Sequence, residues 1–157
     1  MTVIVDLQNA CEGETPQLKQ FQLWVEATLE KEPSVVDDCE LSIRLVDETE
    51  CAELNASYRS KTGPTNVLPF PFDSPIAMEP MLLGDLVICA GVVEREAKEQ
   101  NKASQDHWAH IVVHGCLHLL GYDHIKDDEA EIMETLEVTI LKSLLISDPY
   151  QDQGDIK

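Results

Sequence analysis

Apolar and polar residues follow two different periods along the chain, and these periods predict its secondary structure. Alternating or continuous short apolar runs predict four strands, over residues 2–7, 40–46, 66–70 and 83–89. Apolar residues that recur every three or four positions predict helices over residues 16–31, 47–59, 92–102, 104–121 and 127–145. In the last of these helices the expected apolar stripe is Ile132, Leu136, Thr139, Ile140 and Leu144.

Residues at the ends of these segments give local signals for starts and stops. Asp47 is a candidate N-cap with Glu50 three positions later, and Ser104 is a candidate N-cap for the following long helix. Gly121 can adopt the left-handed conformation that ends a helix. Pro69 predicts that the short strand around it lies at an edge or a bulge, because proline has no backbone N–H.

Together these elements predict an α+β fold, a small mixed β-sheet of about four strands packed with about five helices. The helix over residues 104–121 has few charges on any face, so we expect it to be central and nearly buried. The length suits one domain spanning residues 1–157, with a polar tail that frays from about residue 147.

Composition limits the compartment and the kind of site. The five cysteines are scattered and form no CxxC pair, which argues against a disulfide framework and against a thiolate zinc site. The N-terminus has no basic region, and no segment approaches the roughly 18 apolar residues of a membrane span. These features predict a soluble, cytoplasmic protein without a membrane partner; they leave the oligomeric state undetermined.

The charge distribution is uneven around two segments. A formal net charge of −19 argues against tight autonomous binding of nucleic acid. Residues 54–72 contain no acid while Arg59 and Lys61 supply positive charge, and residues 107–122 contain no acid either. Both segments either line a site for a negative ligand or exclude charge because they are partly buried, and charge alone leaves both interpretations open.

Histidines are concentrated at the end of the predicted central helix. His114 and His118 are four residues apart, so their rings lie on one face about one turn apart and can share a metal. If Gly121 ends the helix, the chain reverses and His124 can supply a third nitrogen. Three histidines with one open position are typical of catalytic zinc, although nickel, copper and iron also accept imidazole.

The spacing HxxxHxxGxxH also matches the metal-binding helix of one class of zinc peptidases. Those enzymes carry a glutamate general base directly after the first histidine, where this chain has Gly115. Peptide hydrolysis by that route is therefore disfavoured. His110 is more typical of a packing or supporting residue than of a ligand, and Asp123 can orient a ligand, accept a proton or cap the turn.

Three segments resemble the YbeY family of bacterial zinc-dependent endoribonucleases. The histidine block HGCLHLLGYDH is close to the family signature, and two further blocks, LNASYRSKTGPTNVLPFPF and LGDLVIC, resemble its other recognisable segments. The resemblance covers essentially the whole chain. It implies a compact α+β fold, one zinc ion per chain on the three histidines, single-stranded RNA as substrate, and a role in 16S ribosomal RNA 3′-end maturation and ribosome quality control.

The same resemblance implies roles for individual residues. Arg59 matches the family's functionally important arginine, and the metal ligands are His114, His118 and His124. We therefore expect Arg59 and His114 to be catalytic and Arg59 and Lys61 to bind substrate; for Arg59 the alternative is a helix-end cation that contacts the last carbonyls. Many members have serine where this chain has Pro69, which removes a hydroxyl and a backbone donor.

Three functions are compared on this basis. The first is a zinc-dependent endoribonuclease that works with the ribosome or its assembly factors. The second is a metal-dependent hydrolase of another substrate, resembling a peptidase or amidohydrolase. The third is a non-enzymatic ribosome assembly factor in which zinc is structural, so that removing the metal would unfold it.

Overall fold

The computed structural model describes residues 2–11, 13–32, 38–59, 65–71, 81–122 and 127–146. Within them the chain forms a four-stranded mixed sheet and five helices, which confirms the expected α+β fold. The strands are β1 (Val3–Asn9), β2 (Cys39–Val46), β3 (Val67–Pro71) and β4 (Met81–Cys89). The helices are α1 (Leu18–Glu30), α2 (Glu48–Arg59), α3 (Ala90–Glu99), α4 (Ser104–Leu119) and α5 (Asp127–Ser143). The tail expected to fray from residue 147 lies outside the described residues.

The sheet is parallel in its centre and antiparallel at one edge. Its strand order is β1-β2-β4-β3, with β1–β2 and β2–β4 parallel and β3–β4 antiparallel. β3 is an edge strand, as Pro69 predicted, since a proline inside the sheet would leave a neighbouring carbonyl without its donor. The register of β2 against β4 shifts between Glu40 and Leu41, which pairs Leu41 with Gly84.

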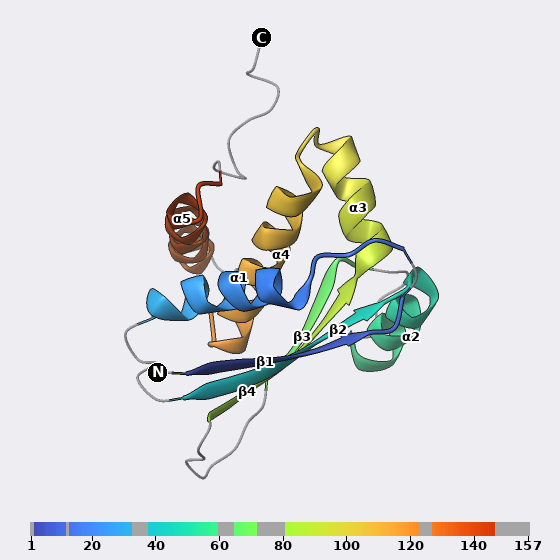
Figure 1. The fold of residues 1–157 in the computed structure, drawn as a ribbon, viewed down its shortest axis with the longest axis horizontal. Helices are drawn as coiled ribbons and strands as arrows, with labels where there is room; N and C mark the ends of the chain where they lie inside the picture. The colour runs from blue at the N-terminus through green and yellow to red at the C-terminus, as the bar shows by residue number, and fades with distance from the viewer. Residues whose placement is uncertain are drawn as a thin grey trace.

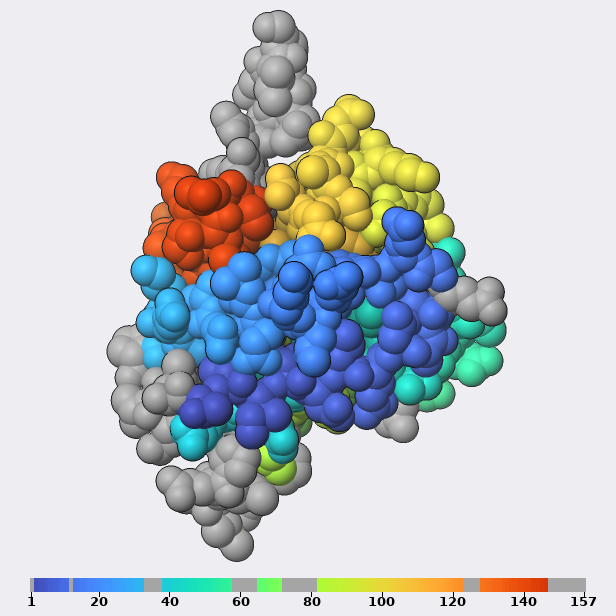
Figure 2. Space-filling view, in the orientation of Figure 1, coloured from blue at the N-terminus to red at the C-terminus, as the bar shows by residue number. Residues whose placement is uncertain are grey.

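α1, α3 and α5 lie on the same side of the sheet as α4, which packs among them (Figure 1). α4 packs against α1, α3, α5 and the strands β3 and β4. Its side chains Trp108, Val112 and Leu117 are fully buried, which confirms the nearly buried central helix. Figure 2 shows α1 across the front of the molecule, with α5 and α4 next to each other above it.

The other face of the sheet is covered at one end by α2. A smaller apolar cluster lies under this helix and consists of Val46, Cys51, Leu68, Val87, Cys89 and Val92. α2 begins as predicted, with the backbone N–H of Glu50 donating to Asp47 Oδ1 at 2.8 Å. None of the helices within the described ranges is both long and apolar enough to cross a membrane.

The sequence predicted the C-terminal end of α4 correctly but misplaced the N-cap. Gly121 has φ 103°, and the N–H groups of Gly121 and Tyr122 donate to the carbonyls of His118 and Leu117, a Schellman stop as expected. The predicted N-cap was wrong by one residue. Ala103 occupies the cap, and the Ser104 hydroxyl instead donates to Glu94 at 2.8 Å, because that carboxylate lies close by on α3.

The buried stripe of α5 is rotated from the predicted one. Ile140 is buried as predicted, and Leu136 and Leu144 are partly buried against the core. Ile132 is 59% exposed and Thr139 is also exposed, whereas Met133 and Glu137, which were not predicted, are buried. The predicted stripe was built from apolar and small residues and omitted Glu137, because charged side chains are rarely buried. The helix turns that glutamate toward α4.

Gly115 allows α4 to lie very close to the sheet. A Cβ atom added there would be 2.8 Å from Leu86 Cδ2 and 3.3 Å from Val67 Cγ2, closer than ordinary van der Waals contact. Leu86 is itself fully buried in the main core. Glycine is therefore needed here for the close approach of a helix to β3 and β4.

Replacing Gly115 with alanine should lower the free energy of unfolding by about 1 kcal/mol. Overpacking a tight core costs about 1–3 kcal/mol, against a gain of about 1 kcal/mol in helix propensity. The matched control is Gly91→Ala, because a Cβ there would meet only the half-exposed side chain of Glu48. Denaturant unfolding of both variants checks this; equal or greater stability for Gly115→Ala would contradict the packing argument.

Candidate metal centre

His114 and His118 meet on one face of α4, as their spacing predicted. Their Nε2 atoms are 3.2 Å apart and their ring centroids are 4.7 Å apart. The side chain of His114 is 23% exposed, so this part of α4 is reachable from solvent although most of the helix is buried. The two nitrogens therefore converge at a half-buried position near the end of the helix.

The spacing of these nitrogens suits a shared metal ion. Two Zn–N bonds of about 2.0–2.1 Å at a tetrahedral angle would separate the nitrogens by about 3.3–3.4 Å. The observed 3.2 Å is close to that value. The donor pair thus fits zinc without a change in the helix.

The remaining predicted site residues are not described. His124 and Asp123 lie outside the described residues, as does Lys61, and α2 ends at Arg59, whose side chain is not described. Within the described ranges, no group of three or more His, Cys, Asp or Glu side chains is arranged to hold a metal. The third ligand and the position of the guanidinium therefore stay predictions.

A carboxylate that sequence reasoning missed lies beside the first histidine. Glu137 Oε1 is 2.5 Å from His114 Nδ1, and Glu137 Oε2 is 3.6 Å from His110 Nε2. Asp123 was considered from the sequence as an acid for this site and Glu137 was missed, because α5 brings in an acid 23 residues after His114. The sequence contains a signal for this contact. Met133, Ile140 and Leu141 are buried and lie three or four residues from Glu137, so Glu137 shares the buried face of α5.

Glu137 is held in its ionised form despite its complete burial. Burial alone raises the pKa of a carboxyl group, but hydrogen bonds and charge from His110 and His114 outweigh it and lower the pKa of Glu137 to about 2. An ionised carboxylate only accepts hydrogen bonds. The Nδ1 atom of His114 therefore carries the proton in this contact.

Another histidine continues along the same side of α4. His107 Nε2 is 3.0 Å from Glu96 Oε1, and the Asn66 side-chain amide donates to the same oxygen at 3.2 Å. Burial lowers the pKa of His107, and the nearby Glu96 opposes this only in part. The rings of His107, His110, His114 and His118 follow one another edge to face, with centroids 4.7–6.2 Å apart.

The surroundings of Gly115 also argue against the zinc-peptidase mechanism. The position where zinc peptidases carry their glutamate faces Leu86 and Val67 in the sheet, and even a Cβ would be too close there. A general base from that position would need α4 to move away from the core. The geometry therefore offers no place for the carboxylate of that mechanism.

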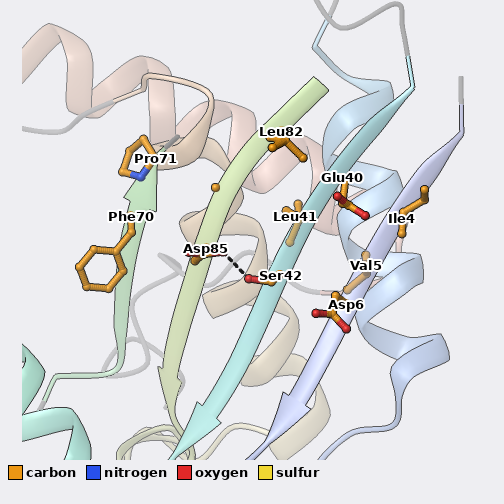
Figure 3. Close-up of a pocket in the computed structure, with 11 residues that line it drawn as sticks. Ile4, Val5, Asp6, Glu40, Leu41, Ser42, Phe70, Pro71, Leu82 and Asp85 are labelled. Atoms are coloured by element: carbon orange, nitrogen blue, oxygen red, sulfur yellow. Dashed lines mark hydrogen bonds between the residues drawn. The ribbon is translucent and has the colours of Figure 1, made fainter. Parts of the chain in front are cut away.

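A separate groove of about 590 Å³ lies on the open face of the sheet (Figure 3). Register brings Asp6, Ser42, Asp85 and Phe70 into one row across the four strands, with Glu40 in the next row. The Ser42 hydroxyl donates to Asp85. The lining is acidic and partly apolar, unlike the imidazole pair on α4.

Comparisons with known proteins identify the family of this chain. The family model described as Endoribonuclease YbeY matches residues 6–145. A protein of Colwellia psychrerythraea named "Endoribonuclease YbeY" is 54% identical over 155 residues, covering 98% of this chain and all of that protein. The solution structure of TM1509 from Thermotoga maritima has a TM-score of 0.58 at 27% identity and covers 99% of each chain. The chain therefore belongs to the endoribonuclease YbeY family.

Proposed function

We propose that the chain is a single-strand-specific, zinc-dependent endoribonuclease that acts in 16S ribosomal RNA 3′-end maturation and ribosome quality control. The observation that carries the proposal is the pair of Nε2 atoms on His114 and His118, 3.2 Å apart, in a member of an endoribonuclease family. The proposed site lies within one domain spanning residues 1–157 and holds one zinc ion through His114, His118 and His124.

In the proposed reaction the metal and an arginine have separate roles. A bound zinc ion would supply Lewis acidity for cleavage of the phosphodiester. The Arg59 guanidinium would hold a phosphate in two places and stabilise the charge that builds up on it. Lys61 would add a further positive charge for the RNA backbone. Glycine at position 115 leaves this site without an adjacent carboxylate base, which suits charge stabilisation better than the peptidase route.

The chain leads from Arg59 to a strand beside the helix of the metal site. Arg59 ends α2, and Val67 at the start of β3 follows it by eight residues. Val67 packs directly against Gly115, the residue after His114. The segment that carries Arg59 and Lys61 therefore leads to a strand that touches the helix of the metal site, and it contains no acid.

The charge of the molecule favours delivery of the RNA by a partner. The net charge is −19, and the open face of the sheet carries Asp6, Glu40 and Asp85, which would repel phosphates. We therefore place the RNA on the histidine side of the molecule. Partners on the ribosome, or assembly factors, would deliver it there. The acidic groove suits a basic protein partner better than RNA.

A cytoplasmic location completes the proposal. All five cysteines are free thiols, and four of them are buried. Free thiols persist in a reducing compartment.

A purely structural zinc is the competing interpretation, and the packing disfavours it. α4 and α5 are joined by buried apolar side chains, among them Met133, Ile140 and Leu117, that need no metal to stay together. Removing zinc should therefore inactivate the protein while leaving it folded.

The zinc content of the purified protein should be about one per chain, as one catalytic site requires. Alanine at His114, His118 or His124 should abolish stoichiometric binding, because each change removes one of three ligands. The control is His107→Gln, which alters a histidine of the same helix that lies away from the pair. Elemental analysis decides, and full zinc occupancy in His124→Ala would remove the third ligand from the assignment.

Arg59→Ala should slow cleavage of unstructured RNA by about a hundredfold or more, the typical effect of removing one preorganised charge-stabilising group. Its free energy of unfolding should change by no more than about 0.5 kcal/mol. The control is Arg95→Ala on α3, whose guanidinium pairs with Glu48 at the surface. Cleavage time courses beside melting curves test this; wild-type rates in Arg59→Ala would leave only the helix-end role.

A further inference from the structure

A fully buried carboxylate lies between two histidines of α4. The Glu137 side chain, from α5, has no exposed surface, and its two oxygens face different rings. Oε1 lies 2.5 Å from His114 Nδ1, a full hydrogen bond, and Oε2 lies 3.6 Å from His110 Nε2, a looser ion-pair contact. Burying a carboxylate costs free energy unless hydrogen-bonding or charged partners replace the lost hydration. The two histidines are such partners.

The hydrogen bond to Glu137 determines which nitrogen of His114 is available to a metal. Because the carboxylate only accepts, Nδ1 of His114 bears the proton and the ring is fixed with Nε2 on its far side. That Nε2 atom is the one that lies 3.2 Å from His118 Nε2. The lone pair of His114 is thus directed toward the position where a shared ion would sit.

The second oxygen faces His110, the histidine that the sequence did not favour as a ligand. His110, His114 and His118 are evenly spaced by four residues, so the pairs 110/114 and 114/118 are equivalent in spacing. In the structure they are not equivalent, since the ring centroids are 6.2 Å apart in the first pair and 4.7 Å apart in the second. Glu137 lies against Nε2 of His110, the nitrogen that a metal on the first pair would need.

We propose that Glu137 is a positioning residue of the metal site, which orients His114 toward His118 and keeps His110 out of the ligand set. The proposal rests on the zinc site proposed above, but its first consequence, the protonation of His114 at Nδ1, exists in the metal-free protein. Supporting carboxylates of this kind typically change metal affinity by about 10–100-fold.

The experiment compares three variants with the wild-type chain. Glu137→Met removes both acceptors and keeps an unbranched side chain of similar length. Glu137→Gln keeps one oxygen that can accept from His114 Nδ1, so it should rescue part of the effect. Glu96→Met is the control, because Glu96 contacts another histidine of the same helix, His107, through its Nε2.

Two measurements test the proposal. The first is ¹⁵N NMR of the imidazole rings in the metal-free protein, with the His114 signals assigned by their loss in His114→Gln. We expect a proton on Nδ1 of His114 in wild type and Glu96→Met, and its loss or exchange between nitrogens in Glu137→Met. The second is zinc affinity by competition with a chromophoric chelator. We expect a Kd about 10–100-fold weaker in Glu137→Met, a smaller loss in Glu137→Gln and none in Glu96→Met.

The outcomes distinguish a failure of this proposal from a failure of the zinc site. A wild-type His114 that carries its proton only on Nε2 would overturn the proposal even if Glu137→Met fails to fold. An unchanged zinc Kd in a folded Glu137→Met variant would overturn it as well. Absence of zinc binding by the wild-type chain, with Nδ1 of His114 still protonated, would instead count against the zinc site and leave the orienting contact established.

Discussion

The close contact between α4 and the sheet at Gly115 determines where the rest of the site can lie. A helix turns about 100° per residue, so with Gly115 against Leu86 the side chain of His114 points roughly a quarter turn away from the sheet. His110 and His118 stack with it, one turn before and one turn after. The histidines therefore point along the sheet, toward α5, and a larger residue at position 115 would move all of them relative to that helix.

This sideways direction explains why a helix without acids of its own beyond its first turn still forms a polar site. The acceptors for the buried imidazoles come from neighbouring helices, Glu96 from α3 and Glu137 from α5. Each carboxylate loses hydration on burial, and the contact with a ring offsets that loss. The contacts to the histidines thus link α4 to α3 and to α5.

The two faces of the sheet carry opposite chemistry because β-strand side chains alternate between them. On the helix-covered face, apolar strand residues such as Leu86 and Val67 support α4 and its imidazoles. On the open face, Asp6, Ser42 and Asp85 lie in one row because the register of β1, β2 and β4 brings them together. The acidic side chains of the groove therefore lie on the face of the sheet opposite α4.

Much of the fold followed from short-range patterns. The four strands and five helices of the described residues were all predicted within a few residues, since periodicity, Pro69 and Gly121 act through neighbouring residues. The pairing of His114 with His118 also followed, because four residues on a helix fix two rings on one face. The cap at Ser104 was wrong because a carboxylate from α3 competed for its hydroxyl.

Only the tertiary structure decided the partners of those histidines. The sequence placed evenly spaced imidazoles along one side of a buried helix and favoured His114 with His118 as ligands, but it could not show which residues hold these rings. The carboxylate at His114 comes from Glu137, which is 23 residues away and reaches it only because α5 rotates its charged residue inward. Local patterns carry no information on such a rotation, since it is set by how Met133 and Ile140 pack into the common core.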